Sequence, residues 1–537
     1  MVAEDGQAVQ GRFSDLYTVV YALIDDAKRD HRLVKLHKGS HGSDNPHPVV
    51  QDVGAYFFLE KKGIFAFVHH AMGAAGARLD ALVAYDSACR PRIATREVFG
   101  LLAECSRRDG ETVEDFTRWV VSRQHDLGRY RGGSSGFDDE AGSFAAAHFR
   151  STGVPASPRE VLVFCGGAKG GMMAMLGAVM CRHEGEKVHR MSGRVLAPVG
   201  YYQSLRILPP IVGGTIDVAA SLDGPDVQAW LADTARECGR VIYAPLVNNV
   251  DGNVLTESRA RGIAAAVLEH NRRHPGNPAY VLGDDVYAGS YLAPGASTRP
   301  IGSIRGDELG SPDLGNMSDW VLSVVTPSKT YALPTSRIAF AHTGNKALRS
   351  AVAHYRTMLS YGRVPQGDEL TAAAAICLTP QQWIDRWNRT YAQRVDRLCT
   401  RLQAINENLG MDAFRLTRPD GGWYAALRIH HGLFADPRVR SSVHALAVCL
   451  NCGRERRDTG LALLPGELSG YRVTPGSPDY ILRASVAVGD DDLDEFTHRL
   501  ADLGALLRSP ARPAAITHAL DRARAVVHDL DTIVETA

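Results

Sequence analysis

The stretch from Val161 to Met180 limits the possible folds of this chain more than any other. An apolar run from Val161 to Cys165 enters a glycine-rich loop, and an apolar helical pattern follows from Met172 to Met180. The whole stretch is apolar enough for a membrane span, but the glycines and Lys169 in its middle indicate a turn instead. It therefore predicts a strand, a loop and a helix, whose free N–H groups at the helix start can bind a phosphate. A plain turn without a ligand is the alternative.

A lysine flanked by small hydroxyl residues is the second informative feature. The segment reads Thr326-Pro327-Ser328-Lys329, and Arg337 follows eight residues later. A lysine amine can form a Schiff base with an aldehyde cofactor such as pyridoxal 5′-phosphate (PLP). The hydroxyl groups and the arginine can bind the phosphate of that cofactor. Taken alone, the motif is also compatible with an ordinary surface lysine.

Polar residues follow two more predicted strands. The apolar run Val241 to Val247 ends before Asn249, and the run from Tyr280 delivers Asp284 and then Tyr287. Ligands of open α/β sheets bind at the carboxyl ends of the strands. A buried aspartate there can keep the pyridine nitrogen of PLP protonated, which makes the ring an electron sink. Asn249 and Tyr287 can hydrogen-bond the ring oxygen, although each residue taken singly can also be a loop cap.

In this order the motifs resemble PLP-dependent enzymes of fold type I, the aspartate aminotransferase superfamily (class I and II), over about residues 30–505. The family's Asn-Pro-Thr-Gly element is matched from Asn249 to Gly252, and its Asp-x-x-Tyr by Asp284 and Tyr287. Its Ser-x-Ser-Lys is matched from Thr326 to Lys329. Arg337 and Arg483 fit the family's phosphate-binding and carboxylate-binding arginines.

The resemblance implies roles for individual residues. The catalytic residues would be Lys329, Asp284 and Tyr287. The cofactor would be bound by Gly167, Ala168, Lys169, Tyr201, Tyr202, Asn249, Asp284, Tyr287, Thr326, Ser328, Lys329, Arg337 and Tyr130. The substrate would be bound by Arg483, Ser40, His41 and Asn249. Either Tyr201 or Tyr202 would stack on the cofactor ring. Tyr130 would reach the cofactor phosphate of a second subunit, and no metal site is expected.

Within the superfamily the chain looks like the aspartate 4-decarboxylase branch. The likeness rests on Leu464-Pro465-Gly466, on the Asp284-Asp285-Val286-Tyr287 motif, and on an extra helical stretch at about residues 76–127. That branch has a Gly-Arg-Gly near its N-terminus, which would bind a side-chain carboxylate. Here the same place reads Gly39-Ser40-His41-Gly42, without an arginine. We therefore expect a substrate other than aspartate.

The resemblance implies an external aldimine with an α-amino acid, removal of the Cα proton by Lys329, and a quinonoid. Transamination, loss of a β-carboxylate, and loss of a γ-leaving group can all follow. The main interpretation is an aminotransferase-like enzyme of specialised bacterial metabolism. The alternatives are elimination or replacement at Cγ, for instance on S-adenosylmethionine, and aspartate 4-decarboxylation. A non-enzymatic PLP-fold binding protein is a further alternative, which the retained Lys329 and Asp284 disfavour.

Composition limits the partners. The chain has 537 residues with 60 basic and 60 acidic side chains, so its net charge gives no reason to expect nucleic acid or an anionic membrane. No basic and apolar leader and no uninterrupted apolar span is found, so a cytoplasmic protein is expected. The family likeness implies a homodimer or larger homo-oligomer with shared active sites.

We expect an α/β fold of the PLP-dependent transferase type, with a mostly parallel sheet in a large domain and a smaller α+β domain. The predicted parts are an N-terminal segment with a helical insertion (1–127), the large PLP-binding domain (128–345), and a small domain with a helical tail (346–537). Helical spacing of apolar residues predicts a helix from Phe13 to Asp26 and a single tail helix from Ala514 to Val534.

Overall fold

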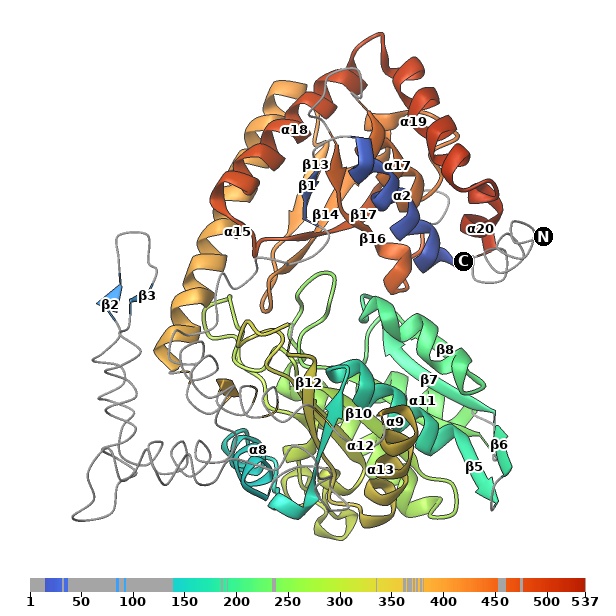
Figure 1. Ribbon diagram of the computed structural model, residues 1–537, viewed down its shortest axis with the longest axis vertical. Coiled ribbons are helices and arrows are strands. Elements are labelled where there is room, and N and C mark those ends of the chain that lie inside the picture. Colours follow the sequence, from blue (N-terminus) through green and yellow to red (C-terminus); the bar gives the residue numbers. More distant parts are fainter. Residues whose placement is uncertain are drawn as a thin grey trace, which may run out of the picture.

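The structure is a computed structural model. It describes residues 15–30, 33–36, 84–85, 91–92, 139–184, 187–190, 192–233, 238–334, 336–360, 381–452, 460–473 and 477–536, and a few positions between 364 and 379. Figure 1 shows these residues in two bodies, one around a large sheet and one that holds the C-terminal third of the chain. We call them the large body and the small body.

A seven-stranded sheet forms the centre of the large body. Its order is β4-β12-β11-β10-β9-β7-β8. Only β12 runs antiparallel to its neighbours, β11 and β4; the other pairs are parallel. The strands are β4 (Val161–Cys165), β7 (Gly193–Pro198), β8 (Gly214–Ala219), β9 (Gly239–Pro245), β10 (Ala279–Asp284), β11 (Val321–Val325) and β12 (Ile338–His342). The mostly parallel sheet predicted from the sequence is confirmed.

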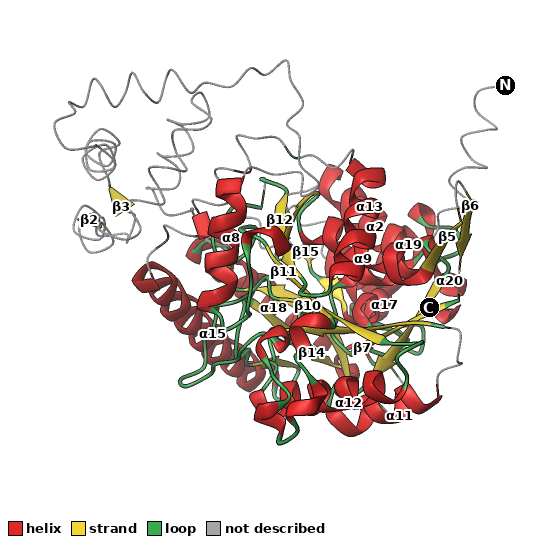
Figure 2. Cartoon of the chain, turned by 90° about the horizontal axis from the view of Figure 1, so that it is seen from below, coloured by secondary structure: helices red, strands yellow, loops and turns green. Residues whose placement is uncertain are grey.

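Helices cover both faces of this sheet, and Figure 2 shows them on opposite sides of the strands. Side chains of β9 alternate between the two layers: Val241 and Tyr243 pack with one set of helices, and Ile242 and Ala244 with the other. One layer holds α9 (Ala168–Met180) and α13 (Lys346–Ser360), and the other holds α11 (Gly224–Asp233) and α12 (Glu257–Arg273). Further elements are α8 (Asp139–Ser151), α10 (Leu208–Ile211), the hairpin β5 (Cys181–Glu184) and β6 (Lys187–Arg190), and the pair β2 (Ala84–Tyr85) and β3 (Pro91–Arg92).

The small body is built on an antiparallel sheet of order β13-β14-β17-β16. These strands are β13 (Phe414–Thr417), β14 (Tyr424–His430), β17 (Asp479–Ser485) and β16 (Leu464–Pro465). A second, parallel pair joins β1 (Val34–Lys35) to β15 (Leu461–Ala462). The N-terminal part of the chain is therefore hydrogen-bonded to the C-terminal part.

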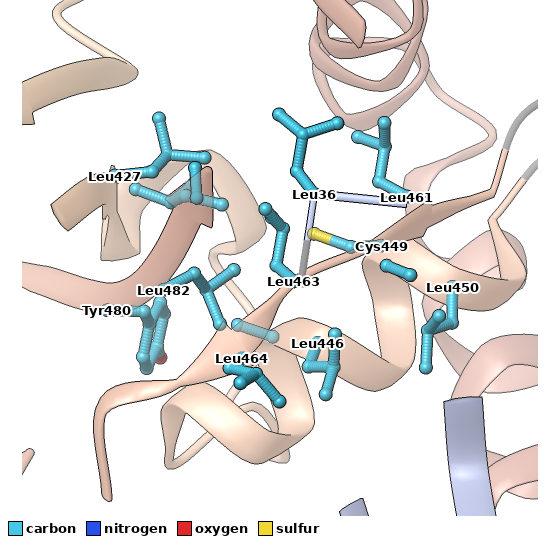
Figure 3. Packing of buried hydrophobic residues seen from close by; sticks show 14 of the residues in the cluster. Leu36, Leu427, Leu446, Cys449, Leu450, Leu461, Leu463, Leu464, Tyr480 and Leu482 are labelled. Atoms are coloured by element: carbon cyan, nitrogen blue, oxygen red, sulfur yellow. The ribbon is translucent and has the colours of Figure 1, made fainter. Parts of the chain in front are cut away.

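Helices pack around that sheet. They are α2 (Leu16–Asp30), α15 (Gln381–Leu409), α16 (His431–Phe434), α17 (Ser442–Asn451), α18 (Asp490–Arg508), α19 (Arg512–Val526) and α20 (Leu530–Thr536). All residues of α17 are buried, because the sheet, α2 and α19 all contact it. Figure 3 shows Leu446, Cys449 and Leu450 of α17 beside Leu461 and Leu482. One hydrophobic cluster thus joins both ends of the chain.

The N-terminal helix predicted from Phe13 to Asp26 is confirmed as α2, which begins at Leu16 among the described residues and continues four residues further, to Asp30. Its buried residues Leu16, Val19, Val20, Leu23 and Ile24 recur at helical spacing. The prediction of a single tail helix is wrong, because the tail forms α19 and α20 with a break at Val527. Beyond the break, Asp531 accepts hydrogen bonds from Arg524 and from His444 of α17, and these bonds hold α20 against the small body.

The boundaries predicted at residues 127 and 345 stay predictions. Of the predicted helical insertion at residues 76–127 the structure describes only 84–85 and 91–92, and the helical prediction is wrong for them, because they pair as the strands β2 and β3. Ser40, His41 and Tyr130 lie outside the described residues. Among the helices that the structure describes, none combines the length and the apolarity needed to cross a lipid bilayer.

Candidate active site

The glycine loop between β4 and α9 can form only with glycine at certain positions. Gly166 and Gly167 have φ angles of +88° and +70°, which other residues rarely adopt. A Cβ atom on Gly170 would lie 2.2 Å from the carbonyl oxygen of Cys165. The close approach lets α9 start directly at the strand end, so its first N–H groups point into the space above the sheet.

Arg337 lies against this loop. Its backbone oxygen accepts a 2.8 Å bond from the Gly167 N–H, and its Nη2 donates a 2.7 Å bond to the Gly166 carbonyl. The arginine has a left-handed φ of +53° and an exposed side chain. Nearby, the buried hydroxyls of Thr326 and Ser328 lie 2.8 Å apart. A guanidinium, two hydroxyls and a helix start therefore surround one point, as an oxyanion requires.

Lys329 is half-buried in an aromatic surrounding. Its Nζ lies 5.9 Å, 5.8 Å and 5.7 Å from the ring centres of Tyr287, Trp423 and Tyr424. Trp423 packs edge-on against Tyr287 with 5.2 Å between the ring centres. The hydroxyl of Tyr287 is buried and has no hydrogen-bond partner among the described residues. The three rings therefore restrict the space around the Lys329 amine, and one of them, Tyr287, carries a hydroxyl that has no hydrogen-bond partner among the described residues.

Asp284, at the end of β10, is a buried carboxylate with one oxygen in use. Its Oδ2 accepts a 2.5 Å bond from the Tyr243 hydroxyl, while Oδ1 has no partner in the described part of the chain. Burial raises the pKa of Asp284 to about 6, against the opposing effects of the Tyr243 bond and the charge of Lys329. Burial and the neighbouring Asp284 raise the pKa of Asp285 to about 8. An unpaired buried oxygen of this kind suits a cationic N–H donor.

Arg483, on β17, reaches across to the large body. Its Nη1 donates to Asn249 Oδ1 and, at 3.1 Å, to Gln203 Oε1. Its guanidinium lies 3.9 Å from the centre of the Tyr424 ring. The arginine is only 4% exposed, so a carboxylate that it bound would be largely shielded from water.

One cavity collects most of the predicted site residues. Its lining includes Ala168, Lys169, Tyr202, Asn249, Asp284, Tyr287, Thr326, Ser328, Lys329 and Arg337. Gly167 adjoins it through its contact with Arg337. The structure separates the two candidate tyrosines, because Tyr202 lines this cavity and Tyr201 lines another one next to Arg206. Ser40, His41 and Tyr130 fall in the part of the chain that the structure does not describe.

Sequence reasoning missed several residues around the cavity. Tyr243 lies opposite Leu282 in the pairing of β9 with β10, so it shares a face with Asp284 two residues further on. Only the strand register shows this. No sequence motif points to Gln203, which contacts Arg483 only in the folded chain. Trp423 and Tyr424 follow Gly421 and Gly422 at the start of a predicted strand, and this aromatic pair was the one available hint.

The residues present fit PLP. The orphan oxygen of Asp284 suits the pyridinium N–H, and the unused Tyr287 hydroxyl suits the ring oxygen. The loop at the start of α9 and Arg337 suit the phosphate. Lys329 lines the same cavity, and its amine would hold the aldehyde carbon.

The comparison with family models decides the identity. The model for aminotransferase class I and II matches residues 133–500. The chain belongs to the aminotransferase class I and II family. It is therefore a PLP-dependent enzyme, as its sequence motifs predicted. A comparison with curated proteins gave no match.

Solved structures of this family have the same fold. The chain is similar to an aspartate aminotransferase double mutant from Thermus thermophilus, with 16% identity, a TM-score of 0.57, and coverage of 91% of this chain and 96% of that one. It is also similar to the aspartate aminotransferase from Rhizobium meliloti, with 18% identity, a TM-score of 0.55, and coverage of 81% and 95%. At such identities the likeness supports the fold and not the substrate.

Proposed function

We propose that this enzyme binds PLP through Lys329 and catalyses an aminotransferase-like reaction on an α-amino acid. The observation that supports it best is the shared cavity: the Lys329 amine, the Asp284 carboxylate and the glycine loop all line it. When bound, the cofactor supplies an aldehyde carbon that accepts amines and a pyridinium ring that withdraws electrons from Cα.

The residues at the two ends of the cofactor have distinct roles in this proposal. Asp284 holds the ring nitrogen protonated, and Tyr243 keeps the carboxylate in place through its 2.5 Å bond. Tyr287 and Asn249 would hydrogen-bond the ring oxygen, and Tyr202 would contact the ring, since all three line the cavity. At the other end, Thr326, Ser328, Arg337 and the loop Gly167-Ala168-Lys169 bind the phosphate, with Lys169 as an additional positive charge.

Substrate binding and proton transfer involve a second group of residues. Arg483 binds the α-carboxylate through its planar fork, and Asn249 and Gln203 orient the guanidinium. Lys329 would hold the aldehyde carbon of the cofactor, and its amine would also serve as the base for the Cα proton of the substrate. The aromatic rings around Lys329 exclude water from that amine.

The substrate is proposed to have a neutral or cationic side chain. Ser40 and His41 stand where the aspartate 4-decarboxylase branch has an arginine for a second carboxylate. L-Aspartate is therefore expected to be a poor substrate. We further propose a homodimer with shared active sites, in which Tyr130 reaches the partner's cofactor, and a cytoplasmic location.

Borohydride reduction followed by peptide mapping tests the cofactor assignment. The pyridoxyl label is expected on Lys329, and a label on Lys169 would contradict the proposal. Lys329→Ala should slow turnover by roughly 10²- to 10⁴-fold or more, since the general base is lost.

Product analysis tests the reaction. The holoenzyme is incubated with a panel of amino acids that includes L-aspartate and S-adenosylmethionine, and the product masses are recorded. A keto acid supports transamination. Release of CO₂ and alanine from L-aspartate would restore the decarboxylase alternative, and loss of the sulfonium group of S-adenosylmethionine would indicate Cγ chemistry.

A further inference from the structure

A second cavity lies between the two bodies, apart from the one that holds Lys329. Its volume is about 730 Å³, within the range of pockets for small organic ligands. The large body contributes β8 and the 3₁₀ turn η2 (Gln203–Ile207); the small body contributes η7 (Gly466–Ser469), the start of α17 and α20. The α20 wall lies beyond residue 500, where the family match ends.

Three arginines line this cavity, against two glutamates. Arg440 is neutralised, because it pairs with Glu535 at 2.6 Å and with Asp531 at 3.4 Å. Arg206 donates a 3.2 Å bond to the Glu467 carbonyl. Arg472 is exposed and has no ion pair with any described residue. A positive charge without a counter-ion among the described residues therefore faces the cavity.

Glu467 adds a buried polar group. Its Oε1 accepts a 2.6 Å bond from the Ser442 N–H, while Oε2 is buried without a partner among the described residues. Burial raises the pKa of Glu467 to about 7. The carboxyl can therefore be protonated when an anion binds beside it, and then it does not repel that anion.

Apolar surface completes the lining. Val218 of β8 is 41% exposed and lines the cavity together with Val473. Gly470 packs between Val218 and Tyr201, since a Cβ on it would lie 2.9 Å and 2.8 Å from these side chains. Water against this surface would be released by a ligand that has an apolar or aromatic body.

We propose that this cavity is a binding site for a small organic anion. Its phosphate or carboxylate group lies on Arg472 and Arg206, and its apolar body lies against Val218 and Val473. The planar fork of arginine matches both kinds of anion. The apolar part distinguishes such a ligand from inorganic phosphate.

The site has a short connection to Asn249. The Gly200 N–H donates a 2.7 Å bond to the Ser469 carbonyl in the cavity wall, and the Gly200 carbonyl accepts a 3.1 Å bond from the Asn249 N–H. A ligand that bridges the two bodies is therefore expected to change the KM of the amino acid substrate more than kcat. This expectation rests on the proposed function, whereas binding itself does not.

Calorimetric titration of the holoenzyme tests the site. PLP is kept saturating, so that the phosphate end of the active site is filled, and the cofactor absorbance reports its occupancy separately. The probes are phenyl phosphate and inorganic phosphate. Phenyl phosphate is expected to bind at least roughly tenfold more tightly, because burying its ring adds hydrophobic free energy.

Two variants and one control complete the test. Arg472→Ala and Val218→Glu should each weaken phenyl phosphate binding by about tenfold or more. Val218 is exposed enough for the glutamate to be tolerated in the fold. Arg508→Ala, an exposed arginine at the end of α18, should leave binding unchanged. Absence of binding, equal affinity for the two probes, or binding unchanged in both cavity variants would each overturn the proposal.

Discussion

At the scale of single residues, the site is built from groups that cost stability. The Asp284 carboxylate is buried with one unpaired oxygen, and burial raises its pKa from 3.8 to about 6. A carboxyl whose pKa is higher in the folded than in the unfolded state favours folding below the unfolded pKa. That contribution is lost as the pH rises through the folded pKa. Without cofactor, the ionised Asp284 therefore destabilises the protein at neutral pH.

Asp284→Asn should make the cofactor-free protein more stable at pH 8 by about 3 kcal/mol, since each pKa unit is worth about 1.4 kcal/mol. Near pH 3 the difference should vanish, because both forms are then uncharged at this position. Urea unfolding at the two pH values measures it. The same variant should lose activity by about tenfold or more, because the ring nitrogen loses its counter-charge. If Asp284→Asn were no more stable than the unsubstituted protein at pH 8, other interactions would have to offset the cost of burying the Asp284 charge.

Gly170 and Gly171 form a matched pair in the glycine loop. A Cβ on Gly170 would meet the Cys165 carbonyl at 2.2 Å, whereas on Gly171 the nearest atom is a side-chain carbon of Phe164 at 3.5 Å. Gly170→Ala should therefore displace the start of α9 and weaken PLP binding by about tenfold or more. Gly171→Ala should bind PLP normally. If a spectroscopic titration gave equal PLP affinities for the two variants, the glycine loop would not be part of the phosphate site.

At the scale of elements, the tail helices are part of the core. The residues of α19 that face α17 and its neighbours are fully buried: Ile516, Ala519, Leu520 and Ala523. The salt bridge of Arg522 with Asp26 at 2.8 Å adds a contact to α2. Since α2 and α19 cover the same helix, the two chain ends stabilise one another.

Leu520→Ala should destabilise the protein by about 3 kcal/mol, the usual cost of a cavity left by a buried leucine. His518→Ala, on the exposed side of the same helix, should change the free energy of unfolding by less than about 0.5 kcal/mol. Urea unfolding of both variants measures the difference. A small effect at Leu520 would mean that α19 is not docked in solution.

At the scale of the whole molecule, the two bodies are joined around the site. The Gly252 carbonyl accepts hydrogen bonds from the N–H groups of Asp420 and Gly421, and the Gly422 N–H donates to the Ser290 carbonyl. Arg483 adds its bond to Asn249. The large body supplies Lys329, Asp284 and Tyr287. The small body supplies Arg483 and two of the three aromatic rings around Lys329, those of Trp423 and Tyr424. A bound cofactor should therefore stabilise the molecule as a unit.

Saturating PLP should raise the free energy of unfolding by about 2.7 kcal/mol at a hundredfold excess over Kd. Pyridoxal, which lacks the phosphate, should stabilise much less at the same concentration. Thermal unfolding followed by circular dichroism measures both. Equal effects of the two compounds would argue against phosphate binding by Arg337 and the glycine loop.

The sequence by itself determined the order of the motifs and the chemistry that they permit. Val161 to Met180 could form only a strand, a tight loop and a helix, because its glycines allow backbone angles that other residues rarely adopt. Lys329, Asp284 and Arg337 were recognisable as candidates because ligands of open α/β sheets bind at strand ends, where these residue types can bind a phosphorylated aldehyde cofactor. The continuous apolar runs predicted the buried strands of the sheet, and the helical apolar spacing predicted α2, because both patterns are local.

Only the tertiary structure decided which distant residues meet. Tyr243 reaches Asp284 through the register of β9 with β10, and register is not encoded in the spacing along one strand. Tyr202 and not Tyr201 lines the cavity of Lys329, because the turn after β7 directs neighbouring side chains to different cavities. The tail is divided into α19 and α20, and the hydrogen bonds of Asp531 with His444 and Arg524 hold α20 in its position after the break. These outcomes depend on contacts between residues far apart in the chain, which local pattern does not determine.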